Sequence, residues 1–174
     1  MPRQLSFEEA RPDSAIRIAE IAKDRIPVRL LLDGVCDQRN IGGLFRTADA
    51  ARIAEIVLYN CPFDLKNRTF KKNARSTYQY VPYRVIEHQK ELIAYSQQHN
   101  LVCVEYTNHS TPIAKTDLPT PITLVVGNEQ RGVSQEVLDI CLKAVHLPML
   151  GIQSSLNVCT AGSIAIYDVL RRHC

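Results

Sequence analysis

Apolar and polar residues alternate in blocks along the chain, and these blocks predict strands and helices in turn. Segments rich in apolar residues predict strands at residues 28–35, 55–60, 83–87, 101–107, 122–129 and 144–149, and the first of them is a continuous apolar run of the kind found in buried strands. Segments with helical spacing separate them, at residues 41–53, 88–99, 133–141 and 155–172. Strands rich in Val, Ile and Leu that alternate with helices are typical of a parallel sheet. We therefore predict an α/β fold with a mostly parallel sheet and helices on both faces.

The first residues form a separate unit in this prediction. Residues 13–25 place apolar side chains among charged ones at helical spacing, which indicates a short amphipathic helix. Pro27 follows and ends it. We expect residues 1–26 to form a short helical arm and residues 27–174 to form one domain.

Composition narrows the class of protein. The 174 residues carry a net charge of +3, which permits a polyanionic partner without requiring one. No signal peptide opens the sequence and no apolar stretch is long enough to span a membrane, so we expect a cytoplasmic protein with no membrane partner. The six cysteines form no CxxC pair, and no Cys or His spacing suits zinc. We therefore expect reduced thiols and no bound metal.

Ligands of open α/β sheets bind beyond the carboxyl ends of the strands, so the segments that follow the apolar runs are candidate sites. After the first run, DQRNIGGLFRTADA places Asn40 at the start of a helix and Arg46 about two turns into it. Gly42 and Gly43 lie in the first turn, where each glycine costs about 1 kcal/mol relative to alanine. We expect a backbone or a ligand to come close to these glycines.

A second candidate is LVVGNEQRGVS, in which Gly127 directly follows a buried run and Gly132 comes five residues later. The segment lacks the GK[ST] of a phosphate loop and the GxGxxG of a dinucleotide site. Glu129 would repel phosphate and suits a ligand with hydroxyl groups or positive charge. The alternative is a plain strand-to-helix turn with an exposed Glu129.

A third candidate is LPMLGIQSSLNV, where Pro148 ends an apolar run and Gly151 supports a tight loop. Ser154 or Ser155 is expected to cap the last helix, and Asn157 to project from its first turn. Such a helix start can offer N–H donors to a polar ligand. Capping alone would explain the serines but not Asn157.

Residues 64–81 and the tyrosine that follows combine positive charge with aromatic rings. This combination suits a phosphate backbone and stacked bases, although a solvated surface loop is the alternative. The residues concerned are Lys66, Arg68, Lys71, Lys72, Arg75, Tyr78, Tyr80 and Tyr83.

The three candidate segments, in this order and spacing, resemble the motifs of the SpoU (TrmH-type) branch of the SPOUT RNA methyltransferases. The resemblance spans residues 30–172 and includes the final stretch LPMLGIQSSLNVCTAGSIAIYDVLRR. It implies a C-terminal deep trefoil knot, S-adenosylmethionine as the cofactor and a homodimer with the last helix in the interface. The implied reaction moves a methyl group to a ribose 2′-hydroxyl of tRNA or rRNA.

The resemblance also implies roles for individual residues. The implied catalytic set is Asn40, Arg46, Glu129, Ser155 and Asn157. The implied cofactor-binding set is Thr107, Gly127, Asn128, Leu147, Met149 and Leu156. We expect RNA contacts from Arg39, Lys71, Lys72 and Arg75.

Arg46 is the usual candidate for the proton-removing group in this family. A guanidinium has a pKa above about 12 and is a poor base. We expect Arg46 instead to hold the adjacent phosphate and to polarise the hydroxyl. The plainer alternative is an ion pair with Asp49 or Asp33.

Two other functions compete with methyl transfer. One is a catalytically silent RNA-binding or ribosome-assembly protein of the same fold, but such a protein could shed the polar residues at positions 40, 46 and 157. The other is a generic nucleotide-binding α/β domain, which would leave the joint spacing of the three segments to chance and would not bind S-adenosylmethionine.

Overall fold

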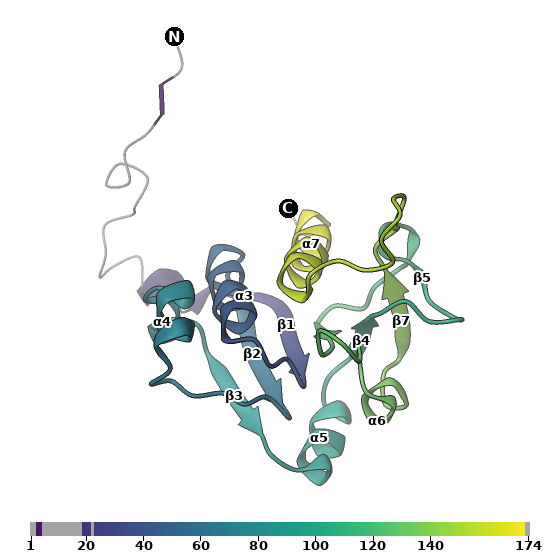
Figure 1. Ribbon diagram of the computed structural model, residues 1–174, viewed down its shortest axis with the longest axis horizontal. Helices are drawn as coiled ribbons and strands as arrows, with labels where there is room; N and C mark the ends of the chain where they lie inside the picture. Colours follow the sequence, from purple (N-terminus) through teal and green to yellow (C-terminus); the bar gives the residue numbers. More distant parts are fainter. Residues whose placement is uncertain (1–2, 5–18, 22, 173–174) are drawn as a thin grey trace.

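Figure 1 shows the computed structural model, which describes residues 3–4, 19–21 and 23–172. Residues 19–21 and 23 are helical, and most of the predicted arm of residues 1–26 lies outside the described residues. Within the described part, no helix is long and apolar enough to cross a membrane.

Seven strands form one sheet in the order β3-β2-β1-β6-β4-β7-β5, and every neighbouring pair runs parallel. The strands are β1 (Ile26–Asp33), β2 (Ile53–Tyr59), β3 (Tyr83–Ile86), β4 (Leu101–Val104), β5 (Thr111–Pro112), β6 (Ile122–Val126) and β7 (Lys143–His146). The predicted parallel α/β sheet is confirmed. The two-residue β5 lies between the strands predicted over residues 101–107 and 122–129, where no strand was predicted.

The helices follow the predicted order, but one helix was not predicted and the bounds of the others differ; the helix predicted over residues 41–53 starts and ends three residues earlier. The helices are α3 (Gln38–Ala50), α4 (Arg68–Ala74), α5 (Gln89–Ser96), α6 (Gln135–Leu138) and α7 (Val158–Arg171), with short 3-10 helices η1 (Thr77–Gln79) and η2 (Ile113–Lys115). The helix α4 lies in the basic stretch, where no helix was predicted. The helix α6 is shorter than residues 133–141, and α7 begins three residues later than residue 155.

Helices cover the two faces of the sheet unequally. Figure 1 shows α3, α4 and α7 side by side above the sheet, with α5 and α6 below it. Side chains alternate along β1, so Leu30 and Leu32 pack in the core beneath α3 and α7, whereas Leu31 packs in the second core with α5 and α6. All three leucines are fully buried. These two cores fix the carboxyl edge of the sheet, where the site lies.

The paired glycines of α3 allow close contact with both neighbouring helices. A Cβ atom on Gly42 would lie 2.8 Å from the backbone nitrogen of Ala74 in α4. A Cβ atom on Gly43 would lie 2.5 Å from Cys159 Sγ in α7. The expected close approach is therefore made by protein, from α4 on one side and α7 on the other.

The order of the strands reverses between β1 and β6. From β1 the chain adds β2 and then β3 on one side, and the later strands lie on the other side. The segments that follow β1 and β6 therefore leave the sheet next to each other, and such a point is where open α/β sheets bind ligands.

We predict that Gly42→Ala lowers the free energy of unfolding by about 1–2 kcal/mol. Overpacking costs about 1–3 kcal/mol, and three contacts below 3.0 Å, two of them with backbone atoms of α4, place Gly42 in the upper half of that range, above the gain of about 1 kcal/mol in helix propensity. Urea denaturation at neutral pH measures the change. Gly151→Ala is the matched control, because no atom lies within 4 Å of the Cβ position there. Equal stability of the two variants would contradict the packing argument.

Candidate active site

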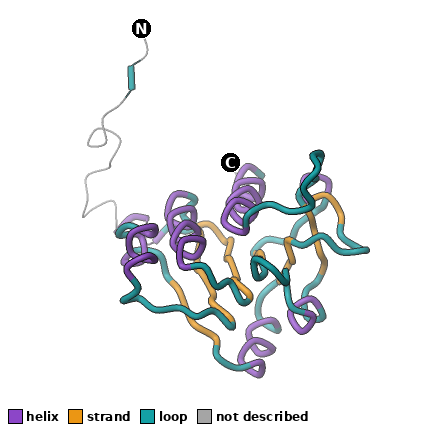
Figure 2. The backbone as a smooth tube through the Cα atoms, in the orientation of Figure 1, coloured by secondary structure: helices purple, strands orange, loops and turns teal. Residues whose placement is uncertain are grey.

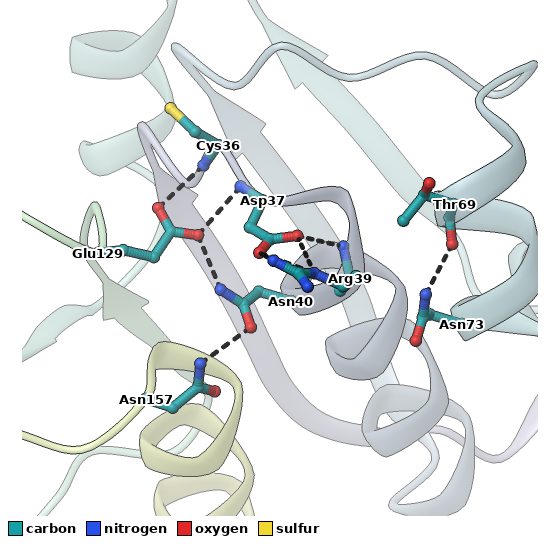
Figure 3. Close-up of polar contacts among 8 residues, drawn as sticks. All are labelled: Cys36, Asp37, Arg39, Asn40, Thr69, Asn73, Glu129 and Asn157. Atoms are coloured by element: carbon teal, nitrogen blue, oxygen red, sulfur yellow. Dashed lines mark hydrogen bonds and ion pairs between the residues drawn. The ribbon is translucent and has the colours of Figure 1, made fainter.

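A chain of hydrogen bonds joins three segments at the carboxyl edge of the sheet. The Glu129 carboxylate accepts from Asn40 Nδ2 at 2.9 Å, and from the backbone N–H groups of Cys36 and Asp37 at 3.1 Å each. Asn40 Oδ1 in turn accepts from Asn157 Nδ2 at 3.0 Å. Figure 3 shows this polar chain, Glu129–Asn40–Asn157, running from the turn after β6 through α3 to the start of α7.

The chemistry of the partners fixes each amide of the polar chain. An ionised carboxylate only accepts hydrogen bonds, so Asn40 Nδ2 faces Glu129 and Asn40 Oδ1 is left to face Asn157. Asn157 Oδ1 then accepts the N–H groups of Cys159 at 2.9 Å and Thr160 at 3.3 Å. Asn40 is only 9% exposed, so an unpaired amide there would be costly.

The cap of α7 is Asn157, and the prediction that Ser154 or Ser155 caps it is wrong. Both serines lie exposed in the loop of residues 147–157, which contains no helix or strand (Figure 2). Asparagine is as good an N-cap as serine, and only Asn157 has its side chain tied to a second element. One residue thus starts the helix and completes the polar chain.

Hydrogen bonding holds Glu129 in its charged form. Burial of the carboxyl acts to raise its pKa, but the hydrogen bonds from Asn40 and from backbone N–H groups outweigh it, and the net pKa lies below the ordinary value. A carboxylate held by these donors is a weak base. Its position suits orienting Asn40 better than accepting a proton.

A pocket of about 750 Å³ opens beside the polar chain. The turn of residues 127–132 forms one wall, and the loop after β7 with the first residues of α7 forms another. The predicted site residues that line it are Gly127, Asn128, Glu129, Leu147, Met149, Ser155 and Leu156. Apolar and polar residues both line these walls. The volume is in the range of pockets that hold small-molecule ligands.

Thr107 does not line this pocket, although it was expected among the cofactor neighbours. Its hydroxyl instead accepts the His109 N–H at 3.3 Å in a local turn. The lining residues that sequence reasoning did not single out include Glu105, Tyr106 and His146. All three lay within segments predicted as strands, and their places at the carboxyl ends of those strands were the available signal.

Arg46 lies apart from the polar chain, on the exposed face of α3. Six residues of helix separate it from Asn40, which is about 9 Å along the axis and about 120° around it. Its place on the helix falls between Gly42, which faces α4, and Gly43, which faces α7. Within the described residues, its guanidinium makes no hydrogen bond or ion pair.

The two ion pairs considered for Arg46 are absent from the described part of the chain. Asp33 is buried and accepts the Ser134 N–H at 2.7 Å. Asp49 lies near Arg25, whose positive charge lowers the pKa of that carboxyl while burial, the larger effect, raises it. Arg46 therefore presents its charge to solvent.

The four residues expected to contact RNA are exposed and lie on α3 and α4. Lys71 and Lys72 lie in the last turn of α4, and Arg75 follows it with φ 56°. Arg39 lies seven residues before Arg46, on the same exposed face of α3. It forms a two-pronged ion pair with Asp37, with Nη2 2.7 Å from Oδ2 and Nε 3.0 Å from the same oxygen.

Metal binding finds no support among the residues that the structure covers. No group of three or more His, Cys, Asp or Glu side chains there could hold a metal ion. The five described cysteines are all free thiols, and Cys36 is the exposed one among them.

The pocket lies at the carboxyl ends of β4, β6 and β7, the edge at which open parallel sheets bind ligands, and this arrangement defines a ligand-binding α/β protein. A model of the SpoU rRNA Methylase family matches residues 27–167, and the chain belongs to this family.

Individual relatives match most of this chain in sequence or in structure. A protein of Blochmanniella floridana named 23S rRNA (guanosine-2′-O-)-methyltransferase RlmB is 30% identical over 161 residues, which is 92% of this chain and 63% of that protein. The crystal structure of the A. aeolicus TrmH/SpoU tRNA modifying enzyme superposes with a TM-score of 0.80 and 25% identity, covering 91% of this chain and 81% of that one.

A third structure, the AdoMet-bound rRNA methyltransferase from Sinorhizobium meliloti, has the same fold with a TM-score of 0.77, at 24% identity. It matches 88% of this chain and 60% of that one. The chain spans about 60% of the length of the curated relatives that it matches.

We predict that Asn40→Ala raises the pKa of the Glu129 carboxyl, because it removes the side-chain hydrogen bond that favours the charged form. Carbon-detected NMR titration of the carboxyl measures the pKa. Asn73→Ala is the matched control, since Asn73 Nδ2 donates to Thr69 O within α4 and does not touch Glu129 (Figure 3). An unchanged Glu129 pKa in Asn40→Ala would refute the account of the polar chain.

Proposed function

We propose that this protein is an S-adenosylmethionine-dependent RNA methyltransferase that acts on a ribose 2′-hydroxyl of tRNA or rRNA in the cytoplasm. The observation that carries the proposal is the polar chain Glu129–Asn40–Asn157 at the edge of the pocket. Membership of the SpoU family supports the reaction. The printed names of its relatives, a 23S rRNA guanosine-2′-O-methyltransferase and a tRNA modifying enzyme, support the substrate class.

The pocket suits S-adenosylmethionine in size and in its mixture of groups. The backbone of Gly127 and Asn128 and the side chains of Leu147, Met149 and Leu156 would hold the cofactor. Apolar walls suit a purine, and backbone polar groups suit its ring nitrogens and the ribose. When bound, the cofactor supplies a methyl group already activated by the sulfonium, so the protein's task is to align and to deprotonate the hydroxyl.

Alignment and deprotonation of the hydroxyl would involve residues at the pocket edge and on the exposed face of α3. Asn157 and Ser155 are placed to orient the ribose, and Asn40 and Glu129 fix Asn157 in turn. Arg46, unpaired among the described side chains, would hold the phosphate next to the target ribose and polarise its hydroxyl. Its exposed place on α3, between the sides of the helix that face α4 and α7, suits contact with a phosphate backbone.

Positive charges on α3 and α4 would extend the phosphate-binding surface beyond Arg46. Arg39 and Arg46 share a face of α3, and Lys71, Lys72 and Arg75 lie on the adjacent α4 or just beyond it. Exposed cations on two adjacent helices suit a polyanion. Release of Arg39 from Asp37 would accompany RNA binding.

We propose that the C-terminal segment forms a deep trefoil knot and that the protein is a homodimer. The knot is supported by the packing of α7 against β1, β4 and β6, which brings the chain back across the sheet after β7. The dimer is supported by exposed apolar residues, Ile164 and Tyr167 on one face of α7 and Leu150 and Ile152 in the preceding loop. Contiguous exposed apolar patches are typical of association surfaces.

The proposed function predicts that methyl-labelled S-adenosylmethionine labels undermodified total RNA and that nucleoside mass spectrometry finds a 2′-O-methyl nucleoside. Arg46→Ala is expected to lower the rate at least a hundredfold. Arg46→Lys is expected to lower it at least tenfold, because lysine cannot make the bidentate contact. Arg84→Lys, on β3 far from the pocket, is the control and should retain activity.

Near-full activity of Arg46→Lys would rule out the bidentate contact. Tight cofactor binding without label in any RNA would favour the silent RNA-binding protein. No cofactor binding would contradict the proposed function altogether.

The proposed dimer predicts that Ile164→Glu yields monomers, because a charge replaces an apolar group in the interface. Sedimentation velocity measures the change. Ile93→Glu is the matched control, since Ile93 is exposed to a similar extent on α5, at the other face of the sheet. A wild-type monomer, or an unchanged dimer in Ile164→Glu, would contradict this arrangement.

A further inference from the structure

The turn of residues 127–132 is closed on itself by contacts within its own backbone. Asn128 and Gly132 exchange two backbone hydrogen bonds of 2.9 Å each. A Cβ atom on Gly127 would lie 2.1 Å from the backbone of Gly132 and Val133. The turn therefore moves as one piece, and its attachment to the sheet decides where its pocket wall lies.

Two carboxylates attach the exit of this turn to the strands that flank β6. Glu105, directly after β4, accepts the Val133 N–H through Oε2 at 2.9 Å. Asp33, at the end of β1, accepts the next N–H, that of Ser134, through Oδ2 at 2.7 Å. The N–H groups of the consecutive residues Val133 and Ser134 are thus held by the two strands on either side of β6.

Only one of the two carboxylates belongs to the pocket. Asp33 is 3% exposed and lies outside the lining, whereas Glu105 forms part of the pocket wall. Glu105 Oε1 also accepts the Tyr106 N–H at 2.9 Å. The Tyr106 ring in turn packs on His146, with centroids 4.6 Å apart. Glu105 therefore ties the turn after β6 to the wall formed by the ends of β4 and β7.

The approach of Glu105 also requires the glycine at position 132. A Cβ atom there would lie 2.5 Å from Glu105 Oε2, and Gly132 has φ +69°, which favours glycine. Both oxygens of the Glu105 carboxylate accept a hydrogen bond, Oε2 from Val133 after the turn and Oε1 from Tyr106 just after β4. Glutamine has the same shape but one acceptor, so it would turn an NH2 group toward one of the two N–H donors.

We propose that Glu105 is a positioning residue for methyl transfer. It sets the distance between the turn of residues 127–132 and the wall formed by the ends of β4 and β7, and so the fit of the cofactor. The inference rests on the proposed function. The turn that Glu105 holds also carries Glu129 to Asn40, so one anchor serves both the pocket and the polar chain.

The test is the affinity of Glu105→Gln for S-adenosylhomocysteine, measured by calorimetry, together with backbone amide exchange in the turn. The dissociation constant is expected to rise at least tenfold, and exchange at Val133 or Tyr106 to accelerate. Because the pocket is open to water, a freed N–H can be hydrated and the fold should persist, which circular dichroism checks. Glu87→Gln, exposed after β3, is the matched control and should change neither quantity.

Glu105→Ala is the second variant, because it removes both acceptors without adding a misplaced donor, and it should weaken binding at least as much. A dissociation constant within twofold of wild type in both variants would overturn the positioning role, whatever happens to the melting temperature. Failure of the wild-type protein to bind S-adenosylhomocysteine would instead overturn the proposed function, and accelerated exchange would then show the anchor as purely structural.

Discussion

The structure of the site depends on one buried amide, that of Asn40. Its two ends are bonded to residues 89 and 117 positions further along the chain, so one side chain fixes the relative places of the segments after β1, after β6 and before α7. A buried amide that loses a partner is left with an uncompensated polar group. The three segments must therefore be correctly placed together, and Asn157 links this requirement to the start of α7 by capping it.

Close packing of helices brings these segments within hydrogen-bonding distance. Gly42 and Gly43 let α3 approach α4 and α7 to distances that a side chain would prevent. On the other side of the polar chain, the closed turn after β6 reaches α3 because Glu105 and Asp33 hold its exit. The glycines and carboxylates thus serve the same end, which is to hold backbone segments close together at the carboxyl edge of the sheet.

The sequence was sufficient for the order of all the strands but β5 and all the α-helices but α4, because long apolar runs and helical spacing are local signals. It was insufficient where local signals compete. Asparagine and serine are equivalent caps, so the start of α7 could be placed only by the bond from Asn157 to Asn40. The helix α4 was not predicted, because it lies in the basic stretch and buries only two of its residues, Phe70 and Ala74. The family resemblance placed Asn40, Glu129 and Asn157 in one site. The hydrogen bonds among them join residues far apart in the sequence, so no local pattern predicts them. Glu105 was not predicted as a site residue because it lies in a segment with the pattern of a strand.

The most direct test of the account is a crystal structure of the protein with S-adenosylhomocysteine. The account predicts that the ligand lies between the turn of residues 127–132 and the loop of residues 147–157. Its sulfur should point toward Asn157, with the bonds among Glu129, Asn40 and Asn157 intact. A ligand bound elsewhere, or a sulfur directed away from the polar chain, would contradict the claim that the polar chain and the pocket form one active site.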